Sequence, residues 1–201
     1  MTDARPVVAA FDFDGTLTYH DSLLPFAIYT QGKMRSTLNL TVELPRLLGF
    51  VLKIVPRQCA KEGLLRRFFG GEHVETVSKW GQEFAHKGIP LLLRPEAMER
   101  FHWHKQQGHR CVIVSASVDV YLNPWGYSVG FNDVLGSRLA VDDHLITGKL
   151  EGQNCWGPEK VKRLEQLLGP KSGYELYAYG DSRGDKEMLE LADHAYNGTF
   201  Q

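Results

Sequence analysis

Three short apolar runs, rich in β-branched and aromatic residues, recur along the chain at wide spacing. They cover Val7–Phe11, Arg110–Val114 and Tyr174–Tyr179. Continuous apolar runs of this length are typical of central strands in a parallel sheet, because such strands are buried on both faces. The pattern predicts three such strands.

Helical patterns lie between and after these runs. Pro95–Gln107 begins with proline and stops before a glycine, and Pro158–Leu168 has apolar residues at helical spacing and ends at Gly-Pro. A short helix is expected over Asp185–Leu191. Alternating strands and helices predict an α/β fold with a doubly wound, Rossmann-like parallel sheet.

Two segments interrupt this alternation. Residues 20–93 show helical patterns without a convincing strand, which predicts a helical cap inserted after the first strand. The α/β core would then comprise residues 1–19 and 94–201. Short alternating runs between Asn132 and Gly152, separated by Asp142-Asp143, predict a β-hairpin at the sheet edge.

Composition limits the possible partners. Charged residues make up 23% of the 201-residue chain and its formal net charge is −1, so it has no general attraction to nucleic acid. Its three cysteines lack zinc or disulfide spacing, and Met1–Pro6 does not read as a secretory signal. We therefore expect a cytoplasmic protein.

A leucine-rich stretch, Thr37–Val55, raises the question of a membrane span. Glu43, Pro45, Arg46 and Lys53 interrupt it, and charges are costly at the centre of a bilayer. The stretch is better explained as an apolar insertion that packs on itself or lies against a membrane surface. The location expected is thus cytoplasmic, with contact at the inner membrane face left open.

The predicted strands end at polar residues. Asp12 follows the first strand, Ser115 the second and Gly180-Asp181 the third. Since the active site of a doubly wound sheet lies outside the carboxyl ends of its strands, these side chains should converge.

Carboxylates dominate this group. Asp12 and Asp14 are separated by one residue, and Asp181 and Asp185 lie after another strand. Mg²⁺ prefers hard oxygen ligands, and a carboxylate can attack phosphorus as a nucleophile. The alternative is that Asp12 and Asp14 form a solvated turn capping the first helix. Asp181 and Asp185 argue against it and favour metal-assisted phosphoryl transfer.

The order of these residues resembles the haloacid dehalogenase superfamily, over nearly the whole chain. Its four motifs correspond to Asp12-Phe13-Asp14-Gly15-Thr16, Ser115, Lys160 and Gly180-Asp181-Ser182-Arg183-Gly184-Asp185. The first and fourth motifs are specific together, whereas Ser115 and Lys160 alone are weak signals. Dehalogenases of the superfamily lack the second acid, so Asp14 favours hydrolysis of phosphate esters.

The resemblance implies a role for each residue. Asp12 would form an aspartyl-phosphate intermediate, and Asp14 would act as general acid and then base. Ser115 and the N–H of Ala116 would hold phosphate oxygens, and Lys160 would stabilise their charge. Ser115 could instead be a strand-end hydroxyl and Lys160 a solvated helix residue.

The same resemblance implies a magnesium cofactor. Asp12 and Asp181 would bind Mg²⁺ through their carboxylates, Asp14 through its backbone carbonyl, and Asp185 would support the site. The anionic nucleophile and anionic substrate repel each other, which a metal and a lysine together would offset.

The cap insertion resembles that of the phosphoserine-phosphatase-like branch, which would close over a small substrate. The leucine-rich cap and the runs around Asp12 and Lys160 look most like the phosphatidylglycerophosphatase C and cell-cycle-phosphatase group. A cap carrying Lys33, Arg35, Arg46, Lys53 and Arg57 could admit a lipid headgroup at an anionic membrane. Equally, the leucines could be the core between cap helices.

Other functions stay open. Asp21 occupies the place where phosphoserine phosphatases recognise the substrate amine, with Lys61, Arg66 and Arg67 following, but it could simply cap a helix. A phosphoserine-type substrate is therefore the alternative to a lipid headgroup. A non-catalytic membrane-binding module and transfer of the phosphoryl group to an alcohol are further possibilities. The sequence does not indicate an oligomeric state.

His102-Trp103-His104 resembles a metal pair, but side chains two residues apart on a helix point to different sides. We expect an ordinary surface helix there.

Overall fold

The computed structural model describes residues 5–200. Met1–Ala4 and Gln201 lie outside the described residues, and so does most of Met1–Pro6, the segment that does not read as a secretory signal. Among the described residues, no helix is both long enough and apolar enough to cross a membrane.

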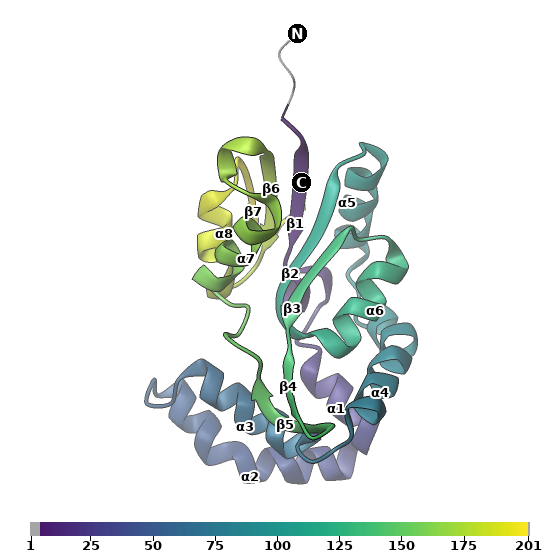
Figure 1. Cartoon of the computed structure of the whole chain (residues 1–201), viewed down its shortest axis with the longest axis vertical. Helices are drawn as coiled ribbons and strands as arrows, with labels where there is room; N and C mark the ends of the chain where they lie inside the picture. The colour runs from purple at the N-terminus through teal and green to yellow at the C-terminus, as the bar shows by residue number, and fades with distance from the viewer. Residues whose placement is uncertain (1–4, 201) are drawn as a thin grey trace.

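Five parallel strands form the central sheet (Figure 1). They are β1 (Val7–Phe11), β2 (Arg110–Val118), β3 (Asp133–Ser137), β6 (Glu175–Gly180) and β7 (His194–Asn197). Their order, β3-β2-β1-β6-β7, places β1 at the centre, flanked by β2 and β6. This confirms the predicted α/β fold with a parallel sheet.

Alternate residues of β1 enter different cores. Ala9 and Phe11 belong to one buried cluster, whereas Val8 and Ala10 belong to another. The strand is therefore apolar on both sides, as expected for a central parallel strand. A continuous apolar run, rather than an alternating one, is the sequence signature of that position.

Four helices cover the two faces of the sheet. They are α5 (Pro95–Gln106), α6 (Asp119–Val129), α7 (Pro158–Leu168) and α8 (Lys186–Leu191). Helices α5 and α6 pack on the first cluster through Phe101 and Trp125. Helices α7 and α8 pack on the second cluster through Leu164 and Met188. Short turns cover Phe13–Leu17, Ile89–Leu91, Lys171–Gly173 and Arg183–Asp185.

The predicted helical insertion lies between β1 and β2. It contains α1 (Leu23–Gln31), α2 (Lys33–Val51), α3 (Arg57–Phe69) and α4 (Val74–Lys87). Its two connections to the core are hydrogen-bonded, from Tyr19 N–H to Leu92 carbonyl and from Arg94 N–H to Leu17 carbonyl, both at 2.9 Å. The cap boundaries at residues 20 and 93 remain a prediction, although these paired connections lie close to them.

The hairpin consists of β4 (Leu139–Asp142) and β5 (Leu145–Leu150), which form a separate two-stranded sheet, and Leu145 also makes an isolated bridge with His73 of the cap. It reaches towards the cap below the main sheet (Figure 1). There the Ile146 N–H donates to the Glu72 carbonyl at 2.8 Å. The predicted hairpin is confirmed by the pairing of β4 with β5, whereas Val134-Leu135, which the prediction included in it, instead form part of the parallel edge strand β3.

His104 also differs from the expected surface helix. Its ring is fully buried, with Nε2 2.9 Å from the Tyr179 hydroxyl and Nδ1 2.7 Å from Nδ1 of His109. Burial, then the positive charges of His109 and Arg100, lower the pKa of His104 to about 3. The helix face carrying His104 packs on the sheet, whereas His102 is exposed. Residues two apart do point to different sides, and one of those sides is the core.

A pH dependence of stability follows from this burial. The folded protein keeps His104 neutral while the unfolded chain gains a proton near pH 6.5, so acidification favours unfolding. Between pH 6.5 and 5 we expect the burial of neutral His104 to lower the free energy of unfolding by at most about 2 kcal/mol. Urea unfolding at both pH values should show a smaller decrease in the free energy of unfolding for His104→Gln than for the unmodified protein. An equal loss in the two proteins would contradict this assignment.

Candidate active site

The carboxyl ends of the central strands bring acidic side chains together. Asp12 follows β1, and Asp181 and Asp185 follow β6. One oxygen from each of the three carboxylates lies within 4.8 Å of the others. Because β1 and β6 are neighbours with Phe11 opposite Tyr179, the chain places these acids at one edge of the sheet.

A buried lysine bridges two of these acids. The Lys160 Nζ donates to Oδ1 of Asp12 at 2.7 Å and to Oδ1 of Asp185 at 2.6 Å. Lys160 lies in the first turn of α7, and its side chain is buried between the two carboxylates. The alternative of a solvated helix residue is therefore wrong for Lys160.

The electrostatics of this cluster depend on burial. Burial raises the pKa of Asp12 to about 6, with Lys160 opposing and Asp185 adding to the rise. The pKa of Lys160 is also raised, because the two carboxylates outweigh its burial. The lysine consequently stays charged and holds the acids together.

Asp185 organises the loop that follows β6. Its Oδ2 accepts hydrogen bonds from the Ser182 N–H at 3.0 Å and the Ser182 hydroxyl at 2.8 Å. A side chain at Gly180 would collide with it, because an added Cβ would lie 2.4 Å from the Asp185 Cβ. Both oxygens of Asp185 thus bind protein groups, which fits a supporting rather than a direct metal-binding position.

Asp181 faces the turn after β1. Its Oδ1 accepts a hydrogen bond from the Thr16 hydroxyl at 3.2 Å. Gly15 has φ +84°, and a Cβ there would lie 2.4 Å from Oδ2 of Asp181. Glycine at this position therefore serves two needs, a left-handed backbone and close approach to the carboxylate. Burial raises the pKa of Asp181.

The acids fit a divalent cation. Asp12 and Asp181 supply hard oxygen donors within reach of one centre, with Asp185 beside them in support, and Lys160 leaves the combined charge of the three acids negative. This confirms an acidic site of the expected kind. The identity of the metal as magnesium and the contribution of the Asp14 carbonyl stay predictions.

The side chain of Asp14 points away from this centre and towards the cap. Its Oδ1 accepts from the Ser22 N–H at 2.8 Å, and its Oδ2 accepts from the Ser117 hydroxyl. Burial raises the pKa of Asp14 to about 7, with the charge of Asp21 adding to the rise. Asp14 can therefore hold a proton near neutral pH, which a general acid requires.

Ser115 lies inside β2, which extends to Val118. Its hydroxyl donates to Oγ of Ser117 at 3.3 Å and accepts from the Ser117 N–H at 3.1 Å. The carbonyl of Ala116 accepts a hydrogen bond from Lys61. Phosphate binding by Ser115 and the Ala116 N–H remains a prediction.

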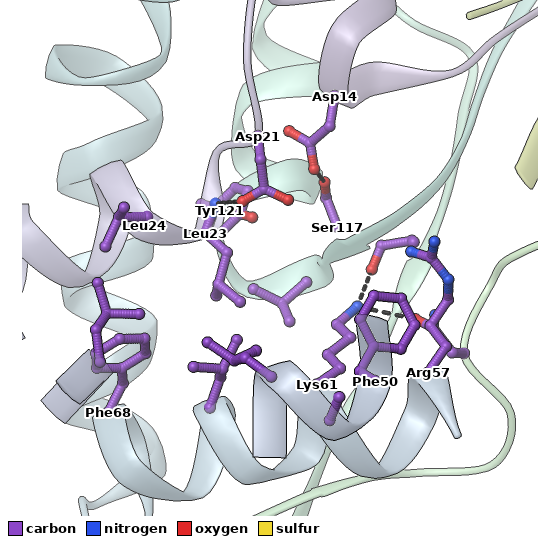
Figure 2. Close-up of a pocket in the computed structure, with 17 residues that line it drawn as sticks. Asp14, Asp21, Leu23, Leu24, Phe50, Arg57, Lys61, Phe68, Ser117 and Tyr121 are labelled. Atoms are coloured by element: carbon purple, nitrogen blue, oxygen red, sulfur yellow. Dashed lines mark hydrogen bonds between the residues drawn. The ribbon is translucent and has the colours of Figure 1, made fainter. Parts of the chain in front are cut away.

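A cavity of about 330 Å³ separates these strand ends from the cap (Figure 2). Its volume is within the range of small-molecule sites. Asp14, Ala116 and Ser117 form its core side. Its cap side is mostly apolar and is formed by Leu23, Leu24, Leu40, Leu47, Phe50, Leu64 and Phe68.

Two basic side chains from α3 stand at one end of this cavity (Figure 2). The Lys61 Nζ donates to Oδ1 of Asn154 at 2.8 Å as well as to Ala116, and burial lowers the pKa of Lys61 to about 8. The Arg57 guanidinium lies 4.6 Å from the Trp156 ring centroid, which tethers cap to core. 

Asp21 also lines the cavity, and its Oδ1 accepts a hydrogen bond from the Leu23 N–H at 2.9 Å. Asp21 thus binds the first N–H of α1 while facing the cavity, although the N-cap position itself is Ser22. The other basic residues of α3, Arg66 and Arg67, are absent from the cavity lining. Arg67 instead pairs with Glu43 at 3.6 Å.

Three polar residues near Asp14 escaped sequence reasoning. The hydroxyl of Ser22 lies 2.8 Å from that of Tyr121 and 3.5 Å from that of Ser117. Ser117 could have been predicted as a site residue, because a residue two after Ser115 in an extended strand lies on the same face. No sequence pattern predicts Ser22 and Tyr121 as site residues, since only the packing of α1 on α6 brings them together.

Comparison with known proteins agrees with this geometry. The family model for haloacid dehalogenase-like hydrolases matches residues 9–190. The chain is 38% identical to Protein CicA of Caulobacter vibrioides over 192 residues, covering 94% of this chain and 84% of that protein. It is 28% identical to a probable phosphatase of Mycobacterium tuberculosis over 193 residues, covering 93% and 67% of the two chains.

A solved structure has the same fold. It is a phospho-aspartyl intermediate analogue of phosphoserine phosphatase, with a TM-score of 0.61, 18% identity, and coverage of 94% of this chain and 84% of that one.

The chain belongs to the haloacid dehalogenase-like hydrolases. Within that family the predicted enzyme class, a phosphatase acting on phosphoric monoesters, is confirmed. The branch resembles phosphoserine phosphatase, as predicted.

Proposed function

We propose that the chain is a magnesium-dependent phosphatase that works through an aspartyl-phosphate intermediate. The observation that carries this proposal is the pair of buried ion pairs from Lys160 to Asp12 and Asp185. The Asp181 carboxylate lies beside these two acids. A carboxylate held by a buried ammonium and adjoining a cation site is suited to attack an anionic phosphate.

In the first step an Asp12 oxygen forms a bond to phosphorus while the ester P–O bond breaks. Asp14, whose pKa burial raises to about 7, gives its proton to the departing alkoxide oxygen. In the second step Asp14 takes a proton from water, which attacks phosphorus and releases phosphate and the Asp12 carboxylate. Asp12, Asp181 and the Asp14 carbonyl would hold Mg²⁺, with Asp185 supporting the site. The bound ion would neutralise charge on the phosphate.

Within the same proposal, Ser115 and the Ala116 N–H hold phosphate oxygens. Lys160 offsets the charge that develops on them. Ser115 lies on β2, next to β1, and Asp12 directly follows β1, which supports this arrangement. The apolar cavity beyond Asp14 then receives the leaving group.

The substrate we infer is a phosphate monoester whose leaving group is partly apolar, such as the headgroup of phosphatidylglycerophosphate. The cap side of the cavity supports this, because leucine and phenylalanine side chains from α1, α2 and α3 face Asp14 across it. Arg57 and Lys61 would meet further anionic groups of the molecule. A lipid substrate also implies peripheral contact of the cap with a membrane.

A phosphoserine-type metabolite is the second candidate. Asp21 and Lys61 line the same cavity and could meet an amine and a carboxylate respectively. Phosphoserine phosphatases are among the relatives and structural neighbours. The large apolar lining favours the amphiphilic substrate, because a small zwitterion would leave it unfilled. A non-catalytic role fits less well, since every predicted motif residue is present.

The proposed reaction can be tested by metal removal. Hydrolysis of p-nitrophenyl phosphate should stop in EDTA and return with Mg²⁺, and Asp181→Asn should raise the Mg²⁺ concentration needed by about tenfold or more. A panel of phosphatidylglycerophosphate, lysophosphatidate and phosphoserine would identify the substrate. An added alcohol acceptor would reveal phosphoryl transfer. Full activity in EDTA would exclude the proposed chemistry.

A further inference from the structure

The outer face of α2 is mostly apolar and uncovered among the described residues, and the hydroxyls of Thr37 and Thr41 on it donate to backbone carbonyls of the helix itself. Met34 is 89% exposed and Leu38 64%, with Val42 continuing the same face at four-residue spacing. After Pro45, exposed Leu48 extends it, and Leu52, which is 68% exposed, follows at the end of the helix. Leu44 and Val51 widen this outer face, and exposed Ile54 lies just beyond the helix. We name these eight apolar residues the α2 outer face.

Basic residues border the α2 outer face. Residues 33–54 contain Lys33, Arg35, Arg46 and Lys53 but one acid, Glu43. Glu43 is buried and pairs with Arg46 at 2.9 Å, so it places little negative charge on the surface. Lys33, Arg35 and Lys53 are exposed at the two ends of the segment. An apolar stripe flanked by cations is complementary to an anionic lipid surface.

The opposite face of the same helix belongs to the cavity. Leu40, Leu47 and Phe50 point inward and line it, across from Asp14. The helix therefore lies as a single layer between the substrate cavity and solvent. In Figure 1 α2 forms the lower edge of the molecule. A surface bound to the outer face would lie one helix diameter from the leaving-group cavity, roughly 10 Å.

We propose that the α2 outer face docks on an anionic lipid bilayer, with α2 lying in the interface plane. This inference rests on the proposed phosphatase function, because docking would bring the cavity to an amphiphilic substrate. The helix lies on the bilayer and does not cross it, because charges interrupt its sequence and no described helix is suited to span. A second copy of the chain would also cover this apolar surface, but the basic residues at the ends of the two α2 helices would then repel each other.

Vesicle sedimentation of the full chain tests the docking. Binding to vesicles of phosphatidylcholine with phosphatidylglycerol should exceed binding to phosphatidylcholine alone. Leu38→Asp with Leu48→Asp should weaken it by about tenfold or more, because two charges enter the apolar layer. Arg35→Glu with Lys53→Glu should also weaken it, mainly at low salt. Leu91→Asp is the matched control, since Leu91 is 83% exposed outside α2 and should bind as the unmodified chain does.

The same samples should be assayed with soluble p-nitrophenyl phosphate. Unchanged turnover in the docking variants shows that the fold and the phosphatase site are intact, so loss of vesicle binding then supports the docking face alone. Absence of binding by the unmodified chain, or equal binding by the Leu38 and Leu48 variant, would overturn the proposal. So would a dimer in analytical ultracentrifugation that this variant dissociates without any vesicle binding.

Discussion

Asp12→Asn is expected to reduce phosphatase turnover by roughly a thousandfold or more, because the amide is a far poorer nucleophile than the carboxylate. The amide also has no charge to hold Lys160 or a cation, although the bond from Lys160 to Asp185 remains to support the fold. Initial rates with p-nitrophenyl phosphate and Mg²⁺ measure the loss. Acid quenching should trap a phosphorylated protein in the unmodified enzyme and none in the variant.

A matched acid separates this effect from a general loss of charge. Asp142→Asn removes an exposed carboxylate at the end of β4, remote in sequence from every motif residue, and should leave the rate unchanged. Circular dichroism of both variants checks that they fold. A folded Asp12→Asn protein with substantial activity would show that another group attacks phosphorus.

Strand ends could be predicted from the sequence because the signal is local. The run Val7–Phe11 is apolar without alternation, and Asp12 follows it at once. Both the buried strand and the position of Asp12 at its carboxyl end could therefore be predicted. The edge strand β3 was harder. Val134-Leu135 are only partly buried and lie in a short run, which resembles a hairpin strand as much as an edge strand.

The lining of the cavity could not be predicted in the same way. Lys61 and Asn154 lie 93 residues apart, and their hydrogen bond depends on how the cap packs on the core. His104 is similar, since its burial follows from contact with Tyr179 on a strand distant in sequence. Motif residues carry their chemistry in their spacing, whereas partners of this kind become visible only when the tertiary structure is known.

Lys160→Met is expected to lower both activity and stability. Methionine nearly fills the same space, but Asp12 and Asp185 would then be buried without their ammonium partner. Breaking a buried ion pair from one side costs about 3 kcal/mol or more in unfolding free energy. Losing a charge that stabilises the transferring phosphoryl group should also reduce turnover by about a hundredfold or more.

The pH dependence of this destabilisation identifies its cause. Without Lys160 the folded-state pKa of Asp12 should rise further, because Lys160 opposes the rise that burial causes, so folding favours the protonated form of Asp12. A carboxyl whose folded pKa exceeds its unfolded value loses stability as pH rises, so the variant should fall furthest behind at pH 8 and least at pH 5. Urea unfolding at both pH values measures this difference. Lys162→Met, on the same helix with a 62% exposed side chain, should change neither activity nor stability appreciably. A pH-independent loss in Lys160→Met would point to packing instead of charge, and loss of activity in Lys162→Met would move the catalytic lysine to that position.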